Sequence, residues 1–261
     1  MVHASGPPGA VPAGPDRHGS KRHRLRSQGN RCLVVVALLI LLPAVVLTER
    51  VRPGTGRRLA RWGVSVVATL CGVRVVVRGP RPREHPGRSV VVPNHSSPMD
   101  VPALLLADPD VRFMAAQDLF RIPLLAPAMR ALGTVPIDRG DRERAHRQLD
   151  ELVDRSGPKS GSDPVDTIVI FAEGGIAPAG RPLPFRSGAF SLAIRTGSRI
   201  LPVAIVGSDR VLAPRGRLTV RPGVVTVEFL EPVDTVGLTV DDHRVLRDHV
   251  QEVVRASAAP I

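Results

Sequence analysis

Residues 90–100, with the sequence VVVPNHSSPMD, constrain the fold more than any other part of this chain. The three valines predict a strand, the polar residues after them predict a turn, and Pro98 suits the start of a helix. His95 and Asp100 would then lie five residues apart at the end of a strand. Open α/β folds often place their chemistry at this point. The stretch therefore indicates both a fold class and a candidate site.

The rest of the sequence alternates predicted strands with predicted helices. Apolar or alternating runs predict strands at 72–79, 89–92, 112–116, 133–139, 167–171 and 200–206, and a hairpin made of 218–221 and 224–230. Helices are predicted at 101–107, 142–155 and 188–196, with a last one from Thr239. We therefore expect residues 72–261 to form a single α/β domain, with a mixed, largely parallel sheet flanked by helices.

The N-terminal quarter predicts a membrane anchor. Residues 1–31 are rich in Gly, Pro, Arg and His, so we expect a disordered basic tail. Residues 33–47 are apolar, interrupted only by Pro43, but as a helix they would span roughly 22 Å, short of a hydrocarbon core of about 30 Å. A second helix is predicted at 57–71, with Trp62 suited to the headgroup level. Residues 32–71 are thus expected to form a membrane-associated helical foot.

Basic residues flank residues 33–47 almost equally on both sides, which gives no clear orientation across a bilayer. A helix that dips into one leaflet from the cytosolic side would have basic residues at both ends. We therefore expect the protein at the cell membrane, with its active site at the cytosolic leaflet. The alternative is one transmembrane helix followed by a soluble helix.

Composition argues against several classes of function. The formal net charge of +12 indicates a surface that attracts anions such as phosphates or anionic lipids. Nucleic acid is not expected as a partner, because much of the basic excess lies in the tail and foot and no zinc-ligand spacing or aromatic stacking surface occurs. The absence of Gly-x-Ser-x-Gly argues against a serine hydrolase, and scattered histidines without His-Glu-x-x-His predict no metal site. Cys32 and Cys71 lie in apolar stretches, which argues against a disulfide framework.

His95 and Asp100 admit two interpretations. A histidine with an ordinary pKa of about 6.5 accepts a proton at neutral pH, and a carboxylate on its other ring nitrogen fixes its tautomer. Such a pair can activate a hydroxyl for attack on a carbonyl. Alternatively, Ser97 and Asp100 form a capping box for a helix that begins at Pro98, and His95 is a loop residue bonded to backbone.

Four sequence blocks, in their order, resemble the glycerolipid acyltransferases typified by lysophosphatidic acid acyltransferase. The blocks are NHSSPMD at 94–100, GTVPIDR at 133–139, FAEG at 171–174 and LPVAI at 201–205, with LPFRSGA at 183–189 between the last two. The resemblance implies transfer of a fatty acyl group from acyl-CoA or acyl carrier protein, as co-substrate, to the free hydroxyl of a lysolipid. The expected acceptor is 1-acyl-glycerol-3-phosphate, the expected partners include membrane lipids, and no separate cofactor is implied.

The resemblance also implies roles for individual residues. His95 would be the general base and Asp100 its orienting partner, with no acyl-enzyme required. Arg139 would bind the acceptor's phosphate with its planar guanidinium, although a surface ion pair is the alternative for this residue. The remaining substrate-binding positions would be Asn94, Glu173 and Gly174.

Two positions depart from the family pattern. The third block usually reads Glu-Gly-Thr-Arg, but Ile176 stands where the arginine is expected, and Gln117 stands where a lysine is common. Arg181 or Arg186 could supply the missing charge. Otherwise the acceptor would carry a less charged head group, as in a lysophospholipid diester or a lyso-aminolipid. A non-catalytic lipid-binding relative is a further alternative.

Overall fold

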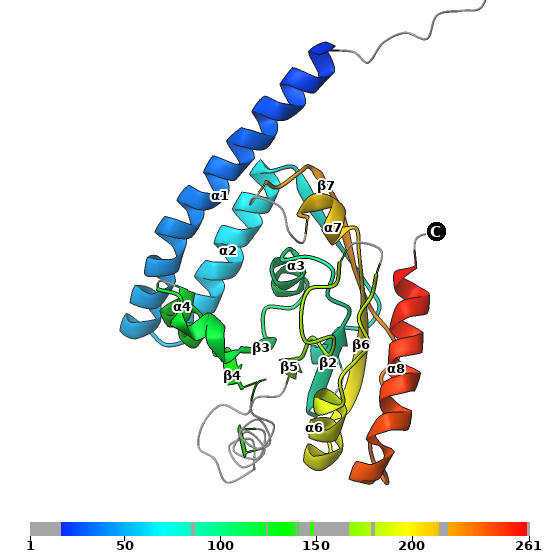
Figure 1. The fold of residues 1–261 in the computed structure, drawn as a ribbon. Helices are drawn as coiled ribbons and strands as arrows, with labels where there is room; N and C mark the ends of the chain where they lie inside the picture. Colours follow the sequence, from blue (N-terminus) through cyan, green and yellow to red (C-terminus); the bar gives the residue numbers. More distant parts are fainter. Residues whose placement is uncertain are drawn as a thin grey trace, which may run out of the picture.

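The computed structural model shows helices packed around one sheet, with a long helix extending from the N-terminal side (Figure 1). It describes residues 17–84, 87–123, 125–138, 140, 147–148, 167–178, 181–213 and 219–259. The α-helices are α1 (Arg17–Val51), α2 (Thr55–Leu70), α3 (Asp100–Ala107), α4 (Leu125–Ala131), α6 (Gly188–Thr196), α7 (Ser208–Val211) and α8 (His243–Ala258). The 3-10 helices are η1 (Pro82–Glu84), η2 (Gln117–Arg121) and η3 (Val240–Asp242).

Seven strands form the central sheet, as expected for a mixed, largely parallel α/β fold. They are β1 (Val73–Arg78), β2 (Ser89–Pro93), β3 (Arg112–Ala116), β4 (Val135–Ile137), β5 (Thr167–Val169), β6 (Arg199–Val206) and β7 (Gly223–Phe229). Their order is β1-β7-β6-β2-β5-β3-β4, and β6 with β7 is the antiparallel pair while the other neighbours are parallel. The carboxyl ends of β2, β5 and β6 consequently meet at one edge, where the candidate site lies.

The predicted hairpin of 218–221 with 224–230 is wrong. In the structure β7 pairs with β1 on one side and with β6 on the other, and residues 219–221 are not in a strand. The Pro-Gly pair at 222–223 suggested a local hairpin. A position between two strands, however, gives hydrogen-bond partners to the N–H and C=O groups on both edges of β7, whereas a hairpin would pair only one edge. Of the predicted helix 142–155 only residues 147–148 are described, so that prediction lies outside the described residues.

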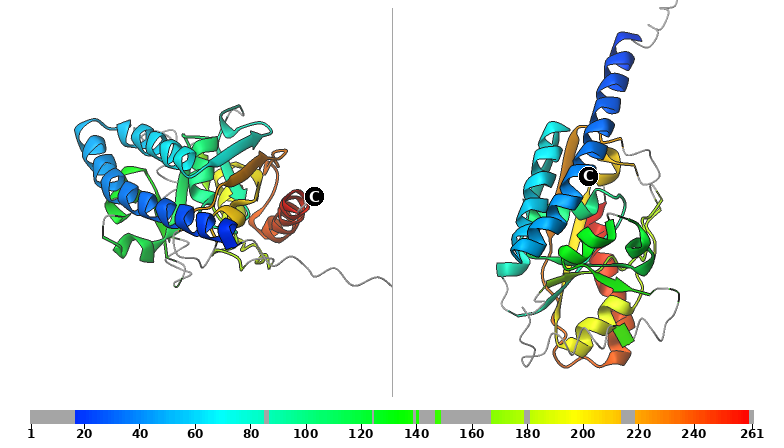
Figure 2. Two further views of the ribbon diagram at one scale, coloured as in Figure 1. Left: turned by 90° about the horizontal axis from the view of Figure 1, so that it is seen from above. Right: turned by 90° about the vertical axis from the view of Figure 1, so that its left-hand side faces the viewer.

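The sheet is covered on both faces, which explains its nearly continuous apolar strands. Val91 and Val203 pack into a cluster with α2, α3 and α7, whereas Val90 and Val92 pack into a second cluster with α6 and α8. Figure 2 shows α8 on the face opposite to the pair α1 and α2. Alternate side chains of β2 thus fix this strand from both sides, immediately before the residues of the candidate site.

Helices α1 and α2 form an antiparallel hairpin beside the sheet (Figures 1 and 2). The carboxylate of Glu49 accepts hydrogen bonds from the backbone N–H groups of Gly54 and Gly56, each at 2.8 Å, and so closes the turn. The helices approach closely at Gly63, where an added Cβ would lie 2.5 Å from Leu41. The two helices therefore pack closely, and hydrogen bonds fix the turn between them.

The boundary predicted between tail and foot is wrong in part. Residues 1–16 lie outside the described residues, but α1 begins at Arg17, inside the segment predicted to be disordered. Once an apolar helix has formed, each further residue adds one hydrogen bond, so propagation continues into the basic segment at little cost. Within α1, the 22 residues Asn30–Val51 have the length and composition of a membrane-spanning helix.

Candidate active site

Asn94 links the ends of two strands directly before the histidine. Its side-chain amide donates to the carbonyl of Ile205 at 2.9 Å and accepts from the N–H of the same residue at 2.7 Å. The amide thereby continues the β2–β6 hydrogen-bond pattern by one rung after the strand ends. This residue, expected to bind substrate, therefore contributes in the structure to holding the loop that carries His95.

His95 and Asp100 are joined as predicted. The Nδ1 atom of His95 lies 2.8 Å from Oδ2 of Asp100, and the same oxygen accepts hydrogen bonds from the backbone N–H groups of Ser96 at 2.8 Å and Ser97 at 2.9 Å. Asp100 is fully buried, while the His95 side chain is 13% exposed. Among the described residues Nε2 has no hydrogen-bond partner. A buried carboxylate thus holds Nδ1–H and leaves Nε2 available to accept a proton.

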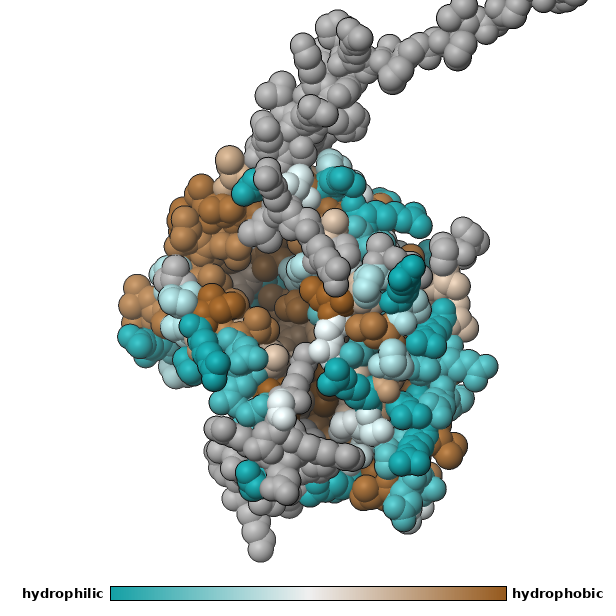
Figure 3. All heavy atoms as spheres, viewed as in Figure 1, coloured by the Kyte–Doolittle hydropathy of each residue, from teal (hydrophilic) through white to brown (hydrophobic). Residues whose placement is uncertain are grey.

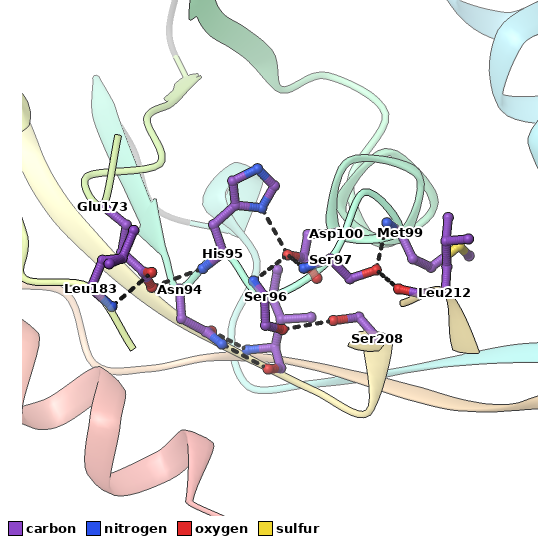
Figure 4. A network of polar contacts seen from close by, with 11 residues as sticks. Asn94, His95, Ser96, Ser97, Met99, Asp100, Glu173, Leu183, Ser208 and Leu212 are labelled. Atoms are coloured by element: carbon purple, nitrogen blue, oxygen red, sulfur yellow. Dashed lines mark hydrogen bonds and ion pairs between the residues drawn. The ribbon is translucent and has the colours of Figure 1, made fainter. Parts of the chain in front are cut away.

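Helix capping and the histidine–carboxylate pair prove compatible. The Ser97 hydroxyl accepts a hydrogen bond from the N–H of Met99 at 3.0 Å and donates one to the carbonyl of Leu212 at 2.6 Å. Asp100, in the first turn of α3, accepts from the N–H of Ser97 as in the reciprocal half of a capping box. The start of the helix is therefore what directs the carboxylate toward His95 (Figure 4).

Glu173 supports the same loop from the other side. Its Oε1 accepts from the backbone N–H of His95 at 3.0 Å, and its Oε2 accepts from the N–H of Leu183 at 3.3 Å. The residue is 3% exposed, and this burial raises the pKa of its carboxyl, opposed by the two backbone hydrogen bonds. In the other direction, the N–H of Ala177 donates to the carbonyl of His95 at 2.8 Å. Glu173 and Ala177 therefore bind the backbone of His95 at both of its polar atoms.

Phe171 is a site residue that the sequence did not single out for chemistry. Its ring stacks on the imidazole of His95, with centroids 3.9 Å apart and an interplanar angle of 24°. It lies two residues after the end of β5, and β5 is next to β2 in the sheet, so its adjacency to His95 depends on strand order. The sequence signal that could have indicated this contact is an aromatic residue near the carboxyl end of a strand that lies beside the strand of the histidine.

Of the other predicted substrate-binding residues, the structure describes Gly174, Arg181 and Arg186. Arg139 lies outside the described residues. Gly174 has φ +73°, and a Cβ added there would lie 2.6 Å from Nε of Arg186, so this guanidinium rests against the third block. Arg181 lines a cavity on a different side of the loop from the His95 ring. Ile176 is partly buried beside the same block and contributes no charge.

An apolar cavity lies between the hairpin and the start of α3. Its volume is about 130 Å³, and its lining includes Met99 and Pro102, which lie within two residues of Asp100 in the sequence. Its other walls come from α1, from α2 and the residue after it, from the start of β1 and from the segments after α7, with residues Val34, Ala37, Leu38, Leu41, Val64, Val67, Ala68, Cys71, Val73, Leu212 and Val220. In Figure 3 apolar residues gather over α1 and α2 and continue into a hollow beside them. The apolar space thus reaches the start of α3, the helix that carries Asp100.

Comparison with known families decides the class of protein. A model described as Acyltransferase matches residues 74–206, which contain the dyad, Glu173 and β2 to β6. The chain belongs to this acyltransferase family. It is accordingly an O-acyltransferase, and the His95–Asp100 pair stands within the part of this acyltransferase that defines the family.

Individual relatives share most of their length with this acyltransferase. It is 29% identical over 213 residues to the 1-acyl-sn-glycerol-3-phosphate acyltransferase of Escherichia coli strain K12, covering 80% of this chain and 83% of that protein. The protein of the same description from Haemophilus influenzae is 25% identical, covering 88% and 92%. The crystal structure of the 1-acyl-sn-glycerophosphate (LPA) acyltransferase PlsC from Thermotoga maritima superposes with a TM-score of 0.70 at 28% identity, covering 92% and 95%. The likeness therefore includes the N-terminal hairpin as well as the sheet.

Proposed function

We propose that this acyltransferase transfers a fatty acyl group from a thioester donor to the free hydroxyl of 1-acyl-glycerol-3-phosphate, at the cytosolic leaflet of the cell membrane. The observation that carries the proposal is the His95–Asp100 pair, with Nδ1 bound at 2.8 Å and Nε2 free of partners among the described residues. The relatives named above support this choice of acceptor.

The reaction follows from that geometry. The acceptor hydroxyl donates its proton to Nε2 of His95 while its oxygen attacks the thioester carbonyl carbon. The C–S bond then breaks, and the leaving thiolate takes the proton back from the imidazolium. Asp100 stabilises the imidazolium charge and keeps the ring in place. General-base assistance of this kind contributes about 10²–10⁴-fold in rate.

The apolar cavity beside Met99 and Pro102 fits part of a fatty acyl chain. It is lined almost entirely by aliphatic side chains, and many of them come from the hairpin that would contact the lipid. Each methylene group removed from water contributes about 0.8 kcal/mol. A chain held there would lie beside the start of α3, the helix that carries Asp100, so the cavity supports a long-chain substrate.

The helical hairpin supports attachment to one leaflet. Exposed apolar side chains run along α1, including Leu39 and Ile40, and Trp62 on α2 is 64% exposed. Helix α1 packs mainly against α2, but two points tie it to the α/β domain: the Asn30 amide donates to the carbonyl of Val220 at 2.9 Å, and Val45, which is 1% exposed, packs in a cluster with Leu105 of α3. A helix held in this way lies beside its domain, which favours burial in a single leaflet over a crossing.

A lysolipid with a less charged head group is the second candidate acceptor. Ile176 supplies no cation where the family has arginine, and Gln117 supplies none where lysine is common. The test is a panel of lysolipids with one acyl-CoA, assayed with wild type and His95→Ala. Preference for 1-acyl-glycerol-3-phosphate supports the proposal, preference for a lysophospholipid diester or lyso-aminolipid supports the second candidate, and equal rates for wild type and His95→Ala contradict both.

A further inference from the structure

A second cavity lies on the opposite face of the catalytic loop from the His95 ring. Figure 4 shows the ring directed to one side of the loop, while the side chains of Asn94 and Ser96 point to the other. Those two side chains, with Glu173, line a cavity of about 390 Å³. Its volume falls in the range of small-molecule sites, about 300–1,000 Å³. The cavity thus shares residues with the catalytic loop without containing the catalytic ring.

Three arginines give this cavity an excess of positive charge. Arg181 comes from the loop after β5, Arg210 from α7 and Arg255 from the end of α8. The guanidinium groups of Arg181 and Arg210 have no hydrogen-bond or ion-pair partner among the described residues, and Arg255 donates to the carbonyl of Leu183 at 3.2 Å. The carboxylates of the lining are those of Asp209 and Glu173, and both oxygens of the latter already accept backbone N–H groups.

The other walls are apolar and come from the same elements. Pro178, Pro182, Phe185 and Val254 are among the lining residues. Apolar walls with a few convergent charged groups are the usual form of a cofactor or ligand site. Unpaired guanidinium groups bind phosphate oxygens bidentately and strongly. The cavity is therefore suited to a ligand that combines phosphate groups with an apolar or planar body.

We propose that this cavity binds the phosphorylated nucleotide end of a coenzyme A thioester, with Arg181, Arg210 and Arg255 contacting its phosphates. This inference rests on the proposed function, because it assigns a place to the donor of that reaction. A pantetheine arm is about as long as an extended peptide of five residues, roughly 17 Å. The cavity is lined by Asn94 and Ser96, the two chain neighbours of His95, so the arm has only to pass this loop for the thioester to meet the ring. Acyl carrier protein, which lacks the nucleotide, would leave the cavity empty.

Binding and kinetics test the proposal separately. In the first measurement, adenosine 3′,5′-bisphosphate is titrated calorimetrically into the full chain in detergent, using wild type, Arg210→Ala, Arg255→Ala and the control Arg244→Ala. Arg244 is exposed on the same helix as Arg255 and does not line the cavity. We expect saturable binding that Arg210→Ala or Arg255→Ala weakens on the order of tenfold, since each removes a charge-assisted contact. The control should bind as wild type does.

In the second measurement, KM is determined for an acyl-CoA and for the matching acyl-pantetheine, which lacks the nucleotide. Arg210→Ala should raise KM for acyl-CoA about tenfold and leave KM for acyl-pantetheine unchanged. Equal effects on both donors, or bisphosphate binding no tighter than that of inorganic phosphate, would overturn the proposal. A third outcome separates the two proposals. If the bisphosphate binds through the arginines but the protein is inactive with every donor, the nucleotide site is supported and the proposed function is contradicted.

Discussion

The backbone N–H of His95 donates a hydrogen bond to Oε1 of Glu173 at 3.0 Å, across a separation of 78 residues. The glutamate lies between two strand ends, with its second oxygen bound to the N–H of Leu183. Its position makes it a positioning residue for the histidine, in addition to the acceptor-side role that the family resemblance implies. His95 is consequently held at three places: Asp100 binds its ring nitrogen, Phe171 stacks on its ring, and Glu173 binds its backbone N–H.

Replacement of Glu173 by alanine should reduce both stability and kcat. The substitution leaves the partly buried N–H groups of His95 and Leu183 without their acceptor. An unsatisfied group costs about 1–3 kcal/mol when buried, and partial burial places each loss toward the lower end of that range. Urea unfolding would show the lower free energy of unfolding, and initial rates would show the lower kcat. A variant with wild-type stability and rate would contradict this role.

The pH dependence of stability should also reveal Glu173. Burial raises the pKa of its carboxyl above the ordinary 4.5, so in the interval between the two values the folded protein binds more protons than the unfolded chain. The contribution of this group is therefore full below the ordinary pKa and is lost as the pH rises through the raised one. The free energy of unfolding of wild type should fall relative to that of Glu173→Gln as the pH rises over this interval. A difference that stays constant with pH would contradict the burial effect.

Replacement of Asp100 by asparagine should lower kcat by about 10²–10⁴-fold with a smaller effect on KM. The amide keeps the size of the side chain but provides no negative charge for the imidazolium that forms when His95 takes the proton. Steady-state kinetics with a saturating donor measure the change. His95→Ala should be at least equally impaired, and the double variant should be no worse than His95→Ala, because the two residues act as one unit.

The apolar cavity should limit the length of the acyl chain. Val64→Phe adds bulk to its wall from α2 and should shift the preferred chain to shorter lengths. Each methylene that no longer fits would lose about 0.8 kcal/mol, or roughly fourfold in kcat/KM. The check is competition among donors of graded chain length. Val66→Phe, on the exposed side of the same helix, is the matched control and should keep the wild-type profile.

Membrane binding should depend on the hairpin. Replacing Trp62 by serine, or both Leu39 and Ile40 by serine, removes exposed apolar surface and should weaken sedimentation with vesicles that contain anionic lipid. The arginines beside Trp62 should make the binding weaker at high salt. Val245→Ser is the control, since Val245 is 74% exposed on α8, away from the hairpin. Equal sedimentation of all variants would exclude the hairpin as the anchor.

Local patterns in the sequence predicted the sheet strands and the dyad because both depend on spacing within a few residues. The run before Asn94 and the five-residue spacing of His95 and Asp100 are features of this kind. By contrast, the partners of β7 and the stacking of Phe171 on His95 depend on strand order, which short-range periodicity does not determine. The start of α1 was also missed, because composition favoured disorder where helix propagation extends the apolar segment.

The hydrogen bonds that Glu49 accepts at the turn between α1 and α2 allow the helical hairpin to form early during synthesis of the chain. The hairpin contacts are local, whereas β1, which follows directly, pairs with β7, and β7 is synthesised about 145 residues after β1 ends. At about 5–20 residues per second, roughly 7–30 s pass before that strand emerges. The hairpin can therefore close and meet a membrane while the sheet is still missing its second strand, so the enzyme would be tethered before it is able to catalyse.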